Sequence, residues 1–205
     1  MTHEITLYGF GPTRSARCQW TLLELDAAFE FVEKRDLIGS DELRNVHPQA
    51  KLPAVVINGQ PLFESAAICT YLCDLYPEKN LIGRVGTHAR ALHDQWTAFT
   101  LSEMEAYLWS NAKHQSFYPE DKRVPDVVAP NSEEFRAGAA VLNDLLADND
   151  YIVENTFSVT DIFVGWTLNW GRRMQQIDGL ENIPPYLQRL FQRLFQRPHC
   201  KLNQE

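Results

Sequence analysis

The segment PAVVINGQPLFE, residues 53–64, constrains the fold more than any other part of this sequence. Two short apolar runs flank Asn58-Gly59, a pair that favours the two-residue type I′ turn of a β-hairpin. Upstream, EITLYGF (4–10) alternates apolar with polar residues and ends at a glycine-proline pair, as expected of a strand followed by a turn. The sequence therefore predicts a hairpin that belongs to a larger sheet.

Two helices and one further strand are expected around this hairpin. SARCQWTLLELDAAF (15–29) has apolar residues at helical spacing, with Ser15 as the predicted N-cap. A second strand is predicted at 30–37, and SAAICTYLCDLY (65–76) predicts a helix that Pro77 ends. The order β-α-β, a short connection and β-β-α indicates a layered α/β domain with a mixed sheet.

Strand signals disappear after residue 80, and the rest of the chain reads as helical. The expected helices are THARALHDQWTAFTLSEMEAYLW (87–109), NSEEFRAGAAVLNDLLA (131–147), SVTDIFVGWTLNWGRRM (158–174) and PPYLQRLFQRLFQ (184–196). Residues 119–131 are predicted to form a loop because they contain several prolines. We therefore expect an α/β domain at 1–78, a linker at 79–86 and an all-helical domain at 87–205, which 205 residues can accommodate.

One helix start in the second half is specified by its local sequence. Ser158 and Asp161 stand at the N-cap and N3 positions of a capping box, in which Asp replaces the usual Glu. Phe157 and Ile162 occupy the two positions of a hydrophobic staple. We interpret this pattern as structural.

The charge of the chain argues against a nucleic-acid partner. The formal net charge is −8, whereas affinity for phosphate backbones depends on concentrated basic surface. Arg189, Arg193 and Arg197 are the exception, because they recur every four residues near the C-terminus. We interpret them as the solvated face of a helix whose apolar residues pack inward: Leu190, Phe191, Leu194 and Phe195.

Neither a metal nor a membrane is expected. The four cysteines form no C-x-x-C pair and the six histidines show no ligand spacing. No apolar run approaches the roughly 20 residues that cross a bilayer. The N-terminus MTHEITLYGF lacks the basic start and apolar stretch of a signal peptide, so we expect a cytoplasmic protein.

The motif KLPAVVINGQPLFESAAICTYL resembles the glutathione S-transferase family, and FSVTDI matches the capping signature of that family's helical domain. The element order, the linker near residue 80 and the chain length agree, so the resemblance covers the whole chain. It implies an N-terminal thioredoxin-like domain that binds glutathione, a cis-proline at Pro53, and a helical C-terminal domain that binds an electrophile. It also implies a cytosolic homodimer of bacterial type that acts in detoxification.

The resemblance implies that five residues bind glutathione: Lys51, Leu52, Pro53, Glu64 and Ser65. The chemistry of these residues suits a ligand with two carboxylates and one ammonium group. Ser65 at a helix N-terminus offers a hydroxyl and backbone N–H groups to a carboxylate. Glu64 supplies a negative charge for the ammonium, and Lys51 a positive charge for the second carboxylate. The backbone of Leu52 pairs with the peptide of the ligand as an added strand would.

Conjugation requires the thiolate of glutathione, which a hydroxyl donor stabilises. In the family the activating residue follows the first strand, where this chain has PTRSAR. We predict Thr13 as the activating residue in preference to Ser15, with both near the sulfur. Arg14 and Arg17 are interpreted as solvated charges. No cysteine occupies this turn, which disfavours a reductase that works through a mixed disulfide.

The second substrate is expected between the domains, lined by aromatic residues of the helical part. The candidates are Tyr107, Trp109, His114, Phe117, Tyr118 and Trp166. The leading hypothesis is a glutathione transferase that attacks a hydrophobic electrophile. Two alternatives remain open: a glutathione-dependent peroxidase, disulfide reductase or isomerase, and a non-catalytic glutathione-binding or protein-interaction module on the same fold.

Overall fold

The computed structural model describes residues 3–11, 13–198, 200 and 202, so Pro12 of the predicted turn lies outside the described residues. The chain divides into two compact units. The first runs to Ile82 and also includes the segment that starts at Gln192, and the second is Gly83–Phe191. The C-terminal segment therefore groups with the first unit, whereas the sequence placed it with the helical domain.

The first unit contains a four-stranded mixed sheet, as predicted. Its strands are β1 (Ile5–Gly9), β2 (Glu30–Glu33), β3 (Ala54–Ile57) and β4 (Gln60–Phe63), in the order β2-β1-β3-β4. Strands β1 and β2 are parallel, and the other two pairings are antiparallel. The β3–β4 turn has positive φ at both Asn58 (49°) and Gly59 (77°), which confirms the type I′ turn.

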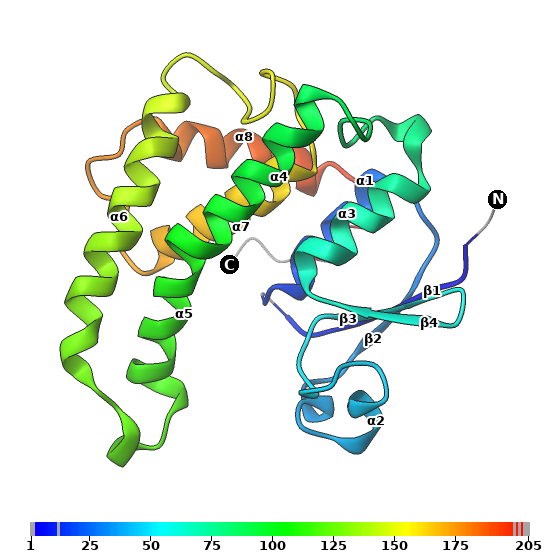
Figure 1. Ribbon diagram of the computed structural model, residues 1–205, viewed down its shortest axis with the longest axis horizontal. Helices are drawn as coiled ribbons and strands as arrows, with labels where there is room; N and C mark the ends of the chain where they lie inside the picture. The colour runs from blue at the N-terminus through cyan, green and yellow to red at the C-terminus, as the bar shows by residue number, and fades with distance from the viewer. Residues whose placement is uncertain (1–2, 12, 199, 201, 203–205) are drawn as a thin grey trace. The chain divides into compact units, whose positions relative to one another are not determined.

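Helices α1 (Ser15–Glu24) and α3 (Ser65–Leu75) pack together over one face of this sheet (Figure 1). The predicted strand at 30–37 is shorter than expected, because its last three residues form the short helix η1 (Arg35–Leu37). The connection from β2 to β3 also contains a second short helix that the sequence did not indicate, α2 (Asp41–Arg44). Leu37 and Leu43 of this connection form a buried cluster with Ala54. The short turn η2 (Pro77–Lys79) follows α3, which ends before Pro77 as predicted.

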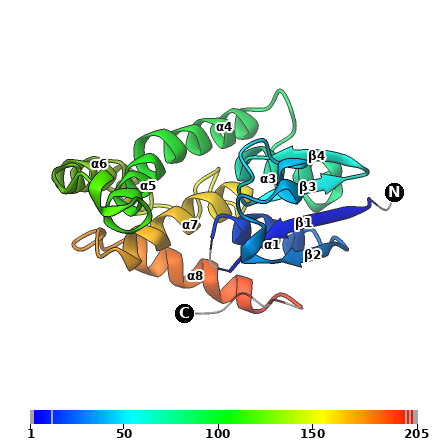
Figure 2. The same ribbon diagram turned by 90° about the horizontal axis from the view of Figure 1, so that it is seen from below.

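The second unit is helical. Its elements are α4 (His88–Thr100), the π-helical η3 (Leu101–Glu105), α5 (Ala106–Ala112), the π-helical η4 (Lys113–Phe117), η5 (Glu120–Lys122), η6 (Pro125–Val127), α6 (Val128–Leu145), α7 (Val159–Arg173) and α8 (Ile183–Phe195), whose last residues belong to the first unit. Figure 2 shows α7 between α4 and α8. The predicted loop at 119–131 is shorter than expected, because α6 accepts a proline in its first turn.

Two local expectations for the second unit are confirmed. The capping box is present, with the Ser158 N–H donating to Asp161 Oδ2 at 2.8 Å. Leu190 and Leu194 of α8 are buried, whereas Phe191 and Phe195 are half-buried. In the described part of the chain, no helix is long and apolar enough to span a membrane. The same residues contain no group of three or more His, Cys, Asp or Glu side chains arranged to hold a metal ion.

Candidate active site

The register of the sheet brings three predicted motifs to one edge. Tyr8 lies opposite Ala54, and Ala54 lies opposite Phe63. The end of β1, the start of β3 and the end of β4 are therefore neighbours. The turn after β1, the Leu52-Pro53 pair and the start of α3 meet at this edge, although they are distant in sequence.

The turn after β1 contains a pair of hydroxyl groups. Thr13 Oγ1 lies 2.7 Å from the carbonyl oxygen of Phe10 and 3.0 Å from Ser15 Oγ. Because a carbonyl only accepts, Thr13 donates its single proton to Phe10 in this arrangement. Ser15 is buried, while Thr13 is half-buried. Thr13 is thus the more accessible hydroxyl, and Ser15 lies directly behind it.

Ser15 is not the N-cap of α1, so that prediction is wrong. The N-cap is Arg14, whose backbone is already helical (φ −57°, ψ −17°) and whose side chain makes no capping hydrogen bond. The Ser15 N–H instead donates to Thr13 Oγ1 at 3.3 Å. The Ser15 hydroxyl consequently faces the end of β1, where the Phe10 N–H donates to it at 3.4 Å.

Gly9 permits this close approach. A Cβ atom at Gly9 would lie 2.5 Å from Phe31 Cε2 and 2.9 Å from Ser15 Cβ. Atoms cannot approach this closely without displacement. The absence of a side chain at Gly9 therefore allows α1 to begin against the end of β1.

The second motif precedes β3. The Leu52–Pro53 peptide is cis, as the family resemblance implies. Pro53 is buried and Lys51 is exposed. Strand β3 begins at Ala54, so the backbone N–H and C=O of Leu52 lie outside its ladder.

The third motif begins α3. Glu64 has φ 70° and ψ 114°, a conformation that non-glycine residues rarely adopt and that often marks a functional position. Its side chain is exposed, while Ser65 at the first position of α3 is buried. The first turn of a helix carries N–H groups without intrahelical partners and a partial positive charge, both of which suit an anion.

Sequence reasoning missed two residues near this edge. Arg17, which we interpreted as solvated, is fully buried, and its Nη1 donates to Ser65 Oγ at 3.4 Å. Helical spacing offered a signal, because Arg17 precedes the buried Trp20 by three positions and shares its face. Burial lowers the pKa of His47, and the charges of Glu64 (raising) and Lys51 (lowering) act on it as well. His47 therefore lies within electrostatic range of both residues, and a lone histidine before a proline gave no sequence signal.

The aromatic candidates of the helical unit fall in different places. Around η4, the Trp109 and Phe117 rings lie 5.2 Å apart, and those of His114 and Tyr118 lie 5.1 Å apart. Lys113 Nζ lies 6.0 Å from the Trp109 ring and 5.9 Å from that of Tyr118. We call Trp109, Lys113, His114, Phe117 and Tyr118 the η4 cluster. Tyr107 lies on α5, and Trp166 lies on α7, where its ring is 6.1 Å from Phe191.

The chain is similar in sequence to several known proteins. Residues 3–74 match the family model of the glutathione S-transferase N-terminal domain. The glutathione S-transferase GstA of Escherichia coli O157:H7 is 25% identical over 186 residues, which cover 88% of this chain and 85% of the relative. Elongation factor 1-gamma of Prunus avium is 28% identical over 165 residues, which cover 78% of this chain but 37% of that protein.

The fold also has close structural counterparts. The structure of a sphingomonad glutathione S-transferase complexed with glutathione superposes with a TM-score of 0.80 and 24% identity, covering 94% of each chain. The two chains therefore share the same fold. Residues 3–74 thus match the glutathione S-transferase N-terminal domain family, and the chain as a whole has the fold of glutathione S-transferases.

Proposed function

We propose that this protein is a glutathione transferase that stabilises the glutathione thiolate for attack on a hydrophobic electrophile. The observation that carries the proposal is the meeting of the Thr13–Ser15 hydroxyl pair, Leu52-Pro53 and Ser65 at one sheet edge. These groups have the chemistry that glutathione requires, and the sphingomonad relative binds glutathione on the same fold.

Each binding residue has a role that follows from its charge and position. Ser65 and the N–H groups of the first turn of α3 bind the γ-glutamyl carboxylate. The exposed carboxylate of Glu64 binds the ammonium group beside it. Lys51 binds the glycyl carboxylate as a flexible point charge. The Leu52 backbone, free of the β3 ladder, pairs with the cysteinyl peptide group, and the cis-Pro53 connects it to β3.

Thr13 is the residue that we assign to the sulfur. Its hydroxyl leaves the Phe10 carbonyl and donates to the thiolate, while Ser15 donates to Thr13 Oγ1 from behind. Each hydroxyl then donates one hydrogen bond, which is the number that its single proton allows. The donated hydrogen bond favours the charged form and lowers the pKa of the thiol, whose proton passes to solvent. The thiolate sulfur then forms a bond to the electrophilic carbon as the leaving group departs.

We assign the electrophile to the helical unit. The η4 cluster combines an exposed apolar surface with one cation, since Phe117 is 65% exposed and Lys113 lies over two of the rings. Aromatic electrophiles that carry a partial negative charge suit such a surface. Tyr107 and Trp166 remain candidates at other positions of the unit.

A glutathione titration combined with two activity assays tests the proposal. Calorimetry with glutathione is followed by conjugation assays on a panel of aromatic electrophiles and by reduction assays on organic hydroperoxides. Binding together with conjugation supports a transferase. Binding with hydroperoxide reduction alone supports the second enzyme class. Binding without turnover indicates a non-catalytic module, and no glutathione binding overturns all three.

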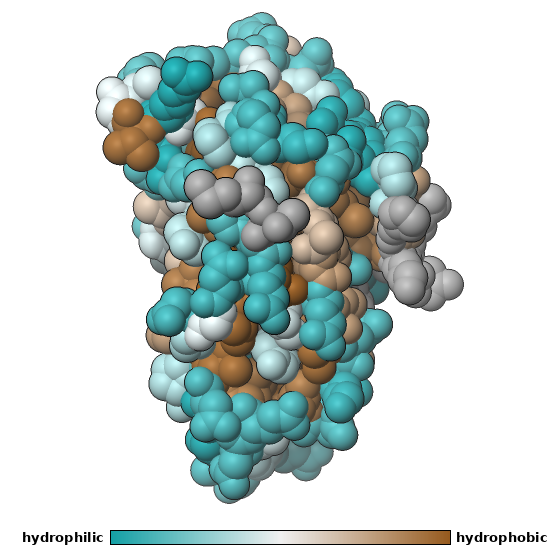
Figure 3. Space-filling view, turned by 90° about the vertical axis from the view of Figure 1, so that its right-hand side faces the viewer, coloured by the Kyte–Doolittle hydropathy of each residue, from teal (hydrophilic) through white to brown (hydrophobic). Residues whose placement is uncertain are grey.

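We further propose that the protein forms a homodimer. Apolar residues reach the surface between hydrophilic ones on the face shown in Figure 3. In the first unit, Phe63 at the end of β4 is 39% exposed and Tyr71 on α3 is 45% exposed. Such residues are enriched at interfaces. Light scattering on Tyr71→Glu should show a shift toward monomer, whereas Val141→Glu on α6 should leave the mass unchanged.

A further inference from the structure

Arg17 occupies an unusual position for a charged residue. It lies on α1 and has 0% of its surface exposed, although arginine is almost never fully buried unless it is paired. Its guanidinium crosses to α3, where Nη1 donates to Ser65 Oγ at 3.4 Å. The contact joins a buried cation to the residue at the first position of α3.

We propose that Arg17 is a positioning residue for the ligand carboxylate that binds at the start of α3. It orients the Ser65 hydroxyl and adds a permanent positive charge behind it. The inference rests on the proposed function, because it assigns the γ-glutamyl carboxylate of glutathione to Ser65.

The hydrogen-bond donors and acceptors explain how the Ser65 hydroxyl is oriented. Guanidinium donates only, so Arg17 uses one acceptor position of Ser65 Oγ and leaves the Ser65 proton to point elsewhere. A hydroxyl that accepts a hydrogen bond becomes a better donor, since hydrogen bonds in a chain polarise one another. The Ser65 proton is therefore directed toward an incoming carboxylate, and the hydroxyl is at the same time a stronger hydrogen-bond donor.

The charge of Arg17 acts in a poorly screened environment. Burial raises the pKa of the neighbouring Cys18 thiol, and the Arg17 charge opposes this rise. Burial also raises the pKa of the Cys69 thiol on α3, whereas the Arg17 charge is among the causes that lower it, so the field of Arg17 reaches α3. At the start of α3 it adds to the partial positive charge of the helix, and both favour an anion. Arginine keeps its charge at every accessible pH.

The experiment compares two ligands that differ by one carboxylate. Affinities are measured for glutathione and for 4-aminobutyryl-cysteinyl-glycine, which lacks only the γ-glutamyl carboxylate. Arg17→Met should weaken glutathione binding by about tenfold or more and change the analogue by less than about twofold. Arg17→Lys, which keeps the charge but loses the planar fork, should fall between wild type and Arg17→Met. In turnover, KM for glutathione should rise while kcat at saturation stays near wild type.

Coupling to Ser65 and a matched control complete the test. The loss in Arg17→Met/Ser65→Ala should be smaller than the product of the two single losses, because Arg17 acts through Ser65. Glu24→Gln removes a buried charge at the other end of α1 and should lower the Tm without changing either affinity. Should Arg17→Met fail to fold, Arg17→Lys with the two ligands decides the question.

Equal losses for both ligands, or no loss for either, would assign Arg17 a purely structural role and overturn the inference. Failure of wild-type protein to bind glutathione would instead overturn the proposed function. The two failures are therefore distinguishable.

Discussion

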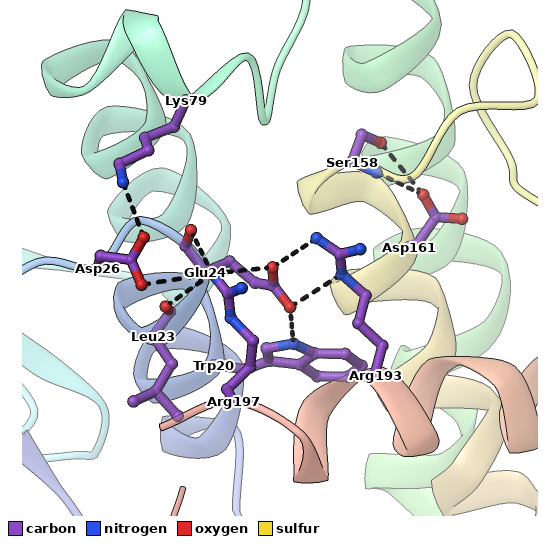
Figure 4. A network of polar contacts seen from close by, with 9 residues as sticks. All are labelled: Trp20, Leu23, Glu24, Asp26, Lys79, Ser158, Asp161, Arg193 and Arg197. Atoms are coloured by element: carbon purple, nitrogen blue, oxygen red, sulfur yellow. Dashed lines mark hydrogen bonds and ion pairs between the residues drawn. The ribbon is translucent and has the colours of Figure 1, made fainter. Parts of the chain in front are cut away.

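Arg193 donates two hydrogen bonds to the carboxylate of Glu24, from Nε to Oε1 at 3.0 Å and from Nη2 to Oε2 at 2.7 Å (Figure 4). The Glu24 side chain is 1% exposed and also accepts from Trp20 Nε1 at 3.1 Å. Arg197 adds hydrogen bonds to the carbonyl oxygens of Leu23 and Glu24. This network explains why the C-terminal segment groups with the first unit.

Removing Arg193 should therefore be costly. Arg193→Ala leaves the buried Glu24 carboxylate with fewer hydrogen bonds and less positive charge beside it. We expect the substitution to lower the free energy of unfolding by about 2–4 kcal/mol. Arg189→Ala is the matched control from the same helix, because its partner Asp150 is 63% exposed. A surface pair of this kind contributes at most about 1 kcal/mol. Urea unfolding measures both, and equal costs would contradict the assigned role of Glu24.

Loss of the Thr13 hydroxyl should affect the thiolate directly. Thr13→Ala is expected to reduce kcat/KM by about tenfold to a hundredfold and to raise the apparent pKa of the bound glutathione thiol by about one unit. Thr13→Ser should retain most activity, since it keeps the hydroxyl. Ser15→Ala should reduce kcat/KM less than Thr13→Ala does, because Ser15 acts through Thr13. A pH profile of kcat/KM that is identical in wild type and Thr13→Ala would refute the assignment.

Gly9→Ala should lower catalytic activity as well as stability, because it displaces residues of the proposed site. The added methyl group would displace Phe31 or the start of α1 at Ser15, which we expect to cost about 1–3 kcal/mol and to lower kcat/KM. Gly165→Ala is the comparison, since its Cβ would collide with Leu190 within the helical unit. It should lose stability while KM for glutathione stays unchanged. An active Gly9→Ala protein with wild-type kinetics would contradict the proposed position of Ser15.

Asp161 should make the stability of the helical unit depend on pH. Burial raises its pKa to about 6, although hydrogen bonds from Ile152, Ser158 and Tyr186 act in the opposite direction. The folded state thus holds a proton that the unfolded state releases between about pH 4 and pH 6. The contribution of Asp161 to the free energy of unfolding therefore falls as the pH rises through this window and is constant above it.

The variant Asp161→Asn does not titrate and isolates this contribution. Its stability deficit relative to wild type should be larger at pH 4 than at pH 7, by up to about 3 kcal/mol. Denaturant unfolding at the two pH values measures the difference. A deficit that is the same at both, or larger at pH 7, would show that the hydrogen bonds outweigh burial.

Features whose partners are close in the chain could be predicted. The Asn58-Gly59 turn and the Ser158–Asp161 capping box were both identified, because each depends on backbone preferences and hydrogen bonds within a few residues. Ser15 shows the limit even at short range. Its role as N-cap was wrong because the backbone of Arg14 is already helical, a detail that the residue types do not specify.

The interpretation of three arginines as solvated, Arg17, Arg193 and Arg197, was wrong for a different reason. Arg17 meets Ser65 across 48 residues, and Arg193 meets Glu24 across 169. Helical spacing shows which side chains share a face, but it does not show whether water or a distant carboxylate meets that face. Burial of a charge depends on that distant partner, so the face that Arg17 shares with Trp20 was a signal that local sequence alone could not decide.

The sequence by itself determined the order of the strands and the main helices, the mixed sheet and the motifs at Thr13, Pro53 and Ser65, since these follow from local propensity and from family resemblance. Only the tertiary structure decided which groups meet at the sheet edge. The register of β1, β3 and β4 aligns the three motifs, and the packing of α1 on α3 places Arg17 behind Ser65. Such contacts form only when the tertiary structure forms, because their energies depend on partners that no single segment contains.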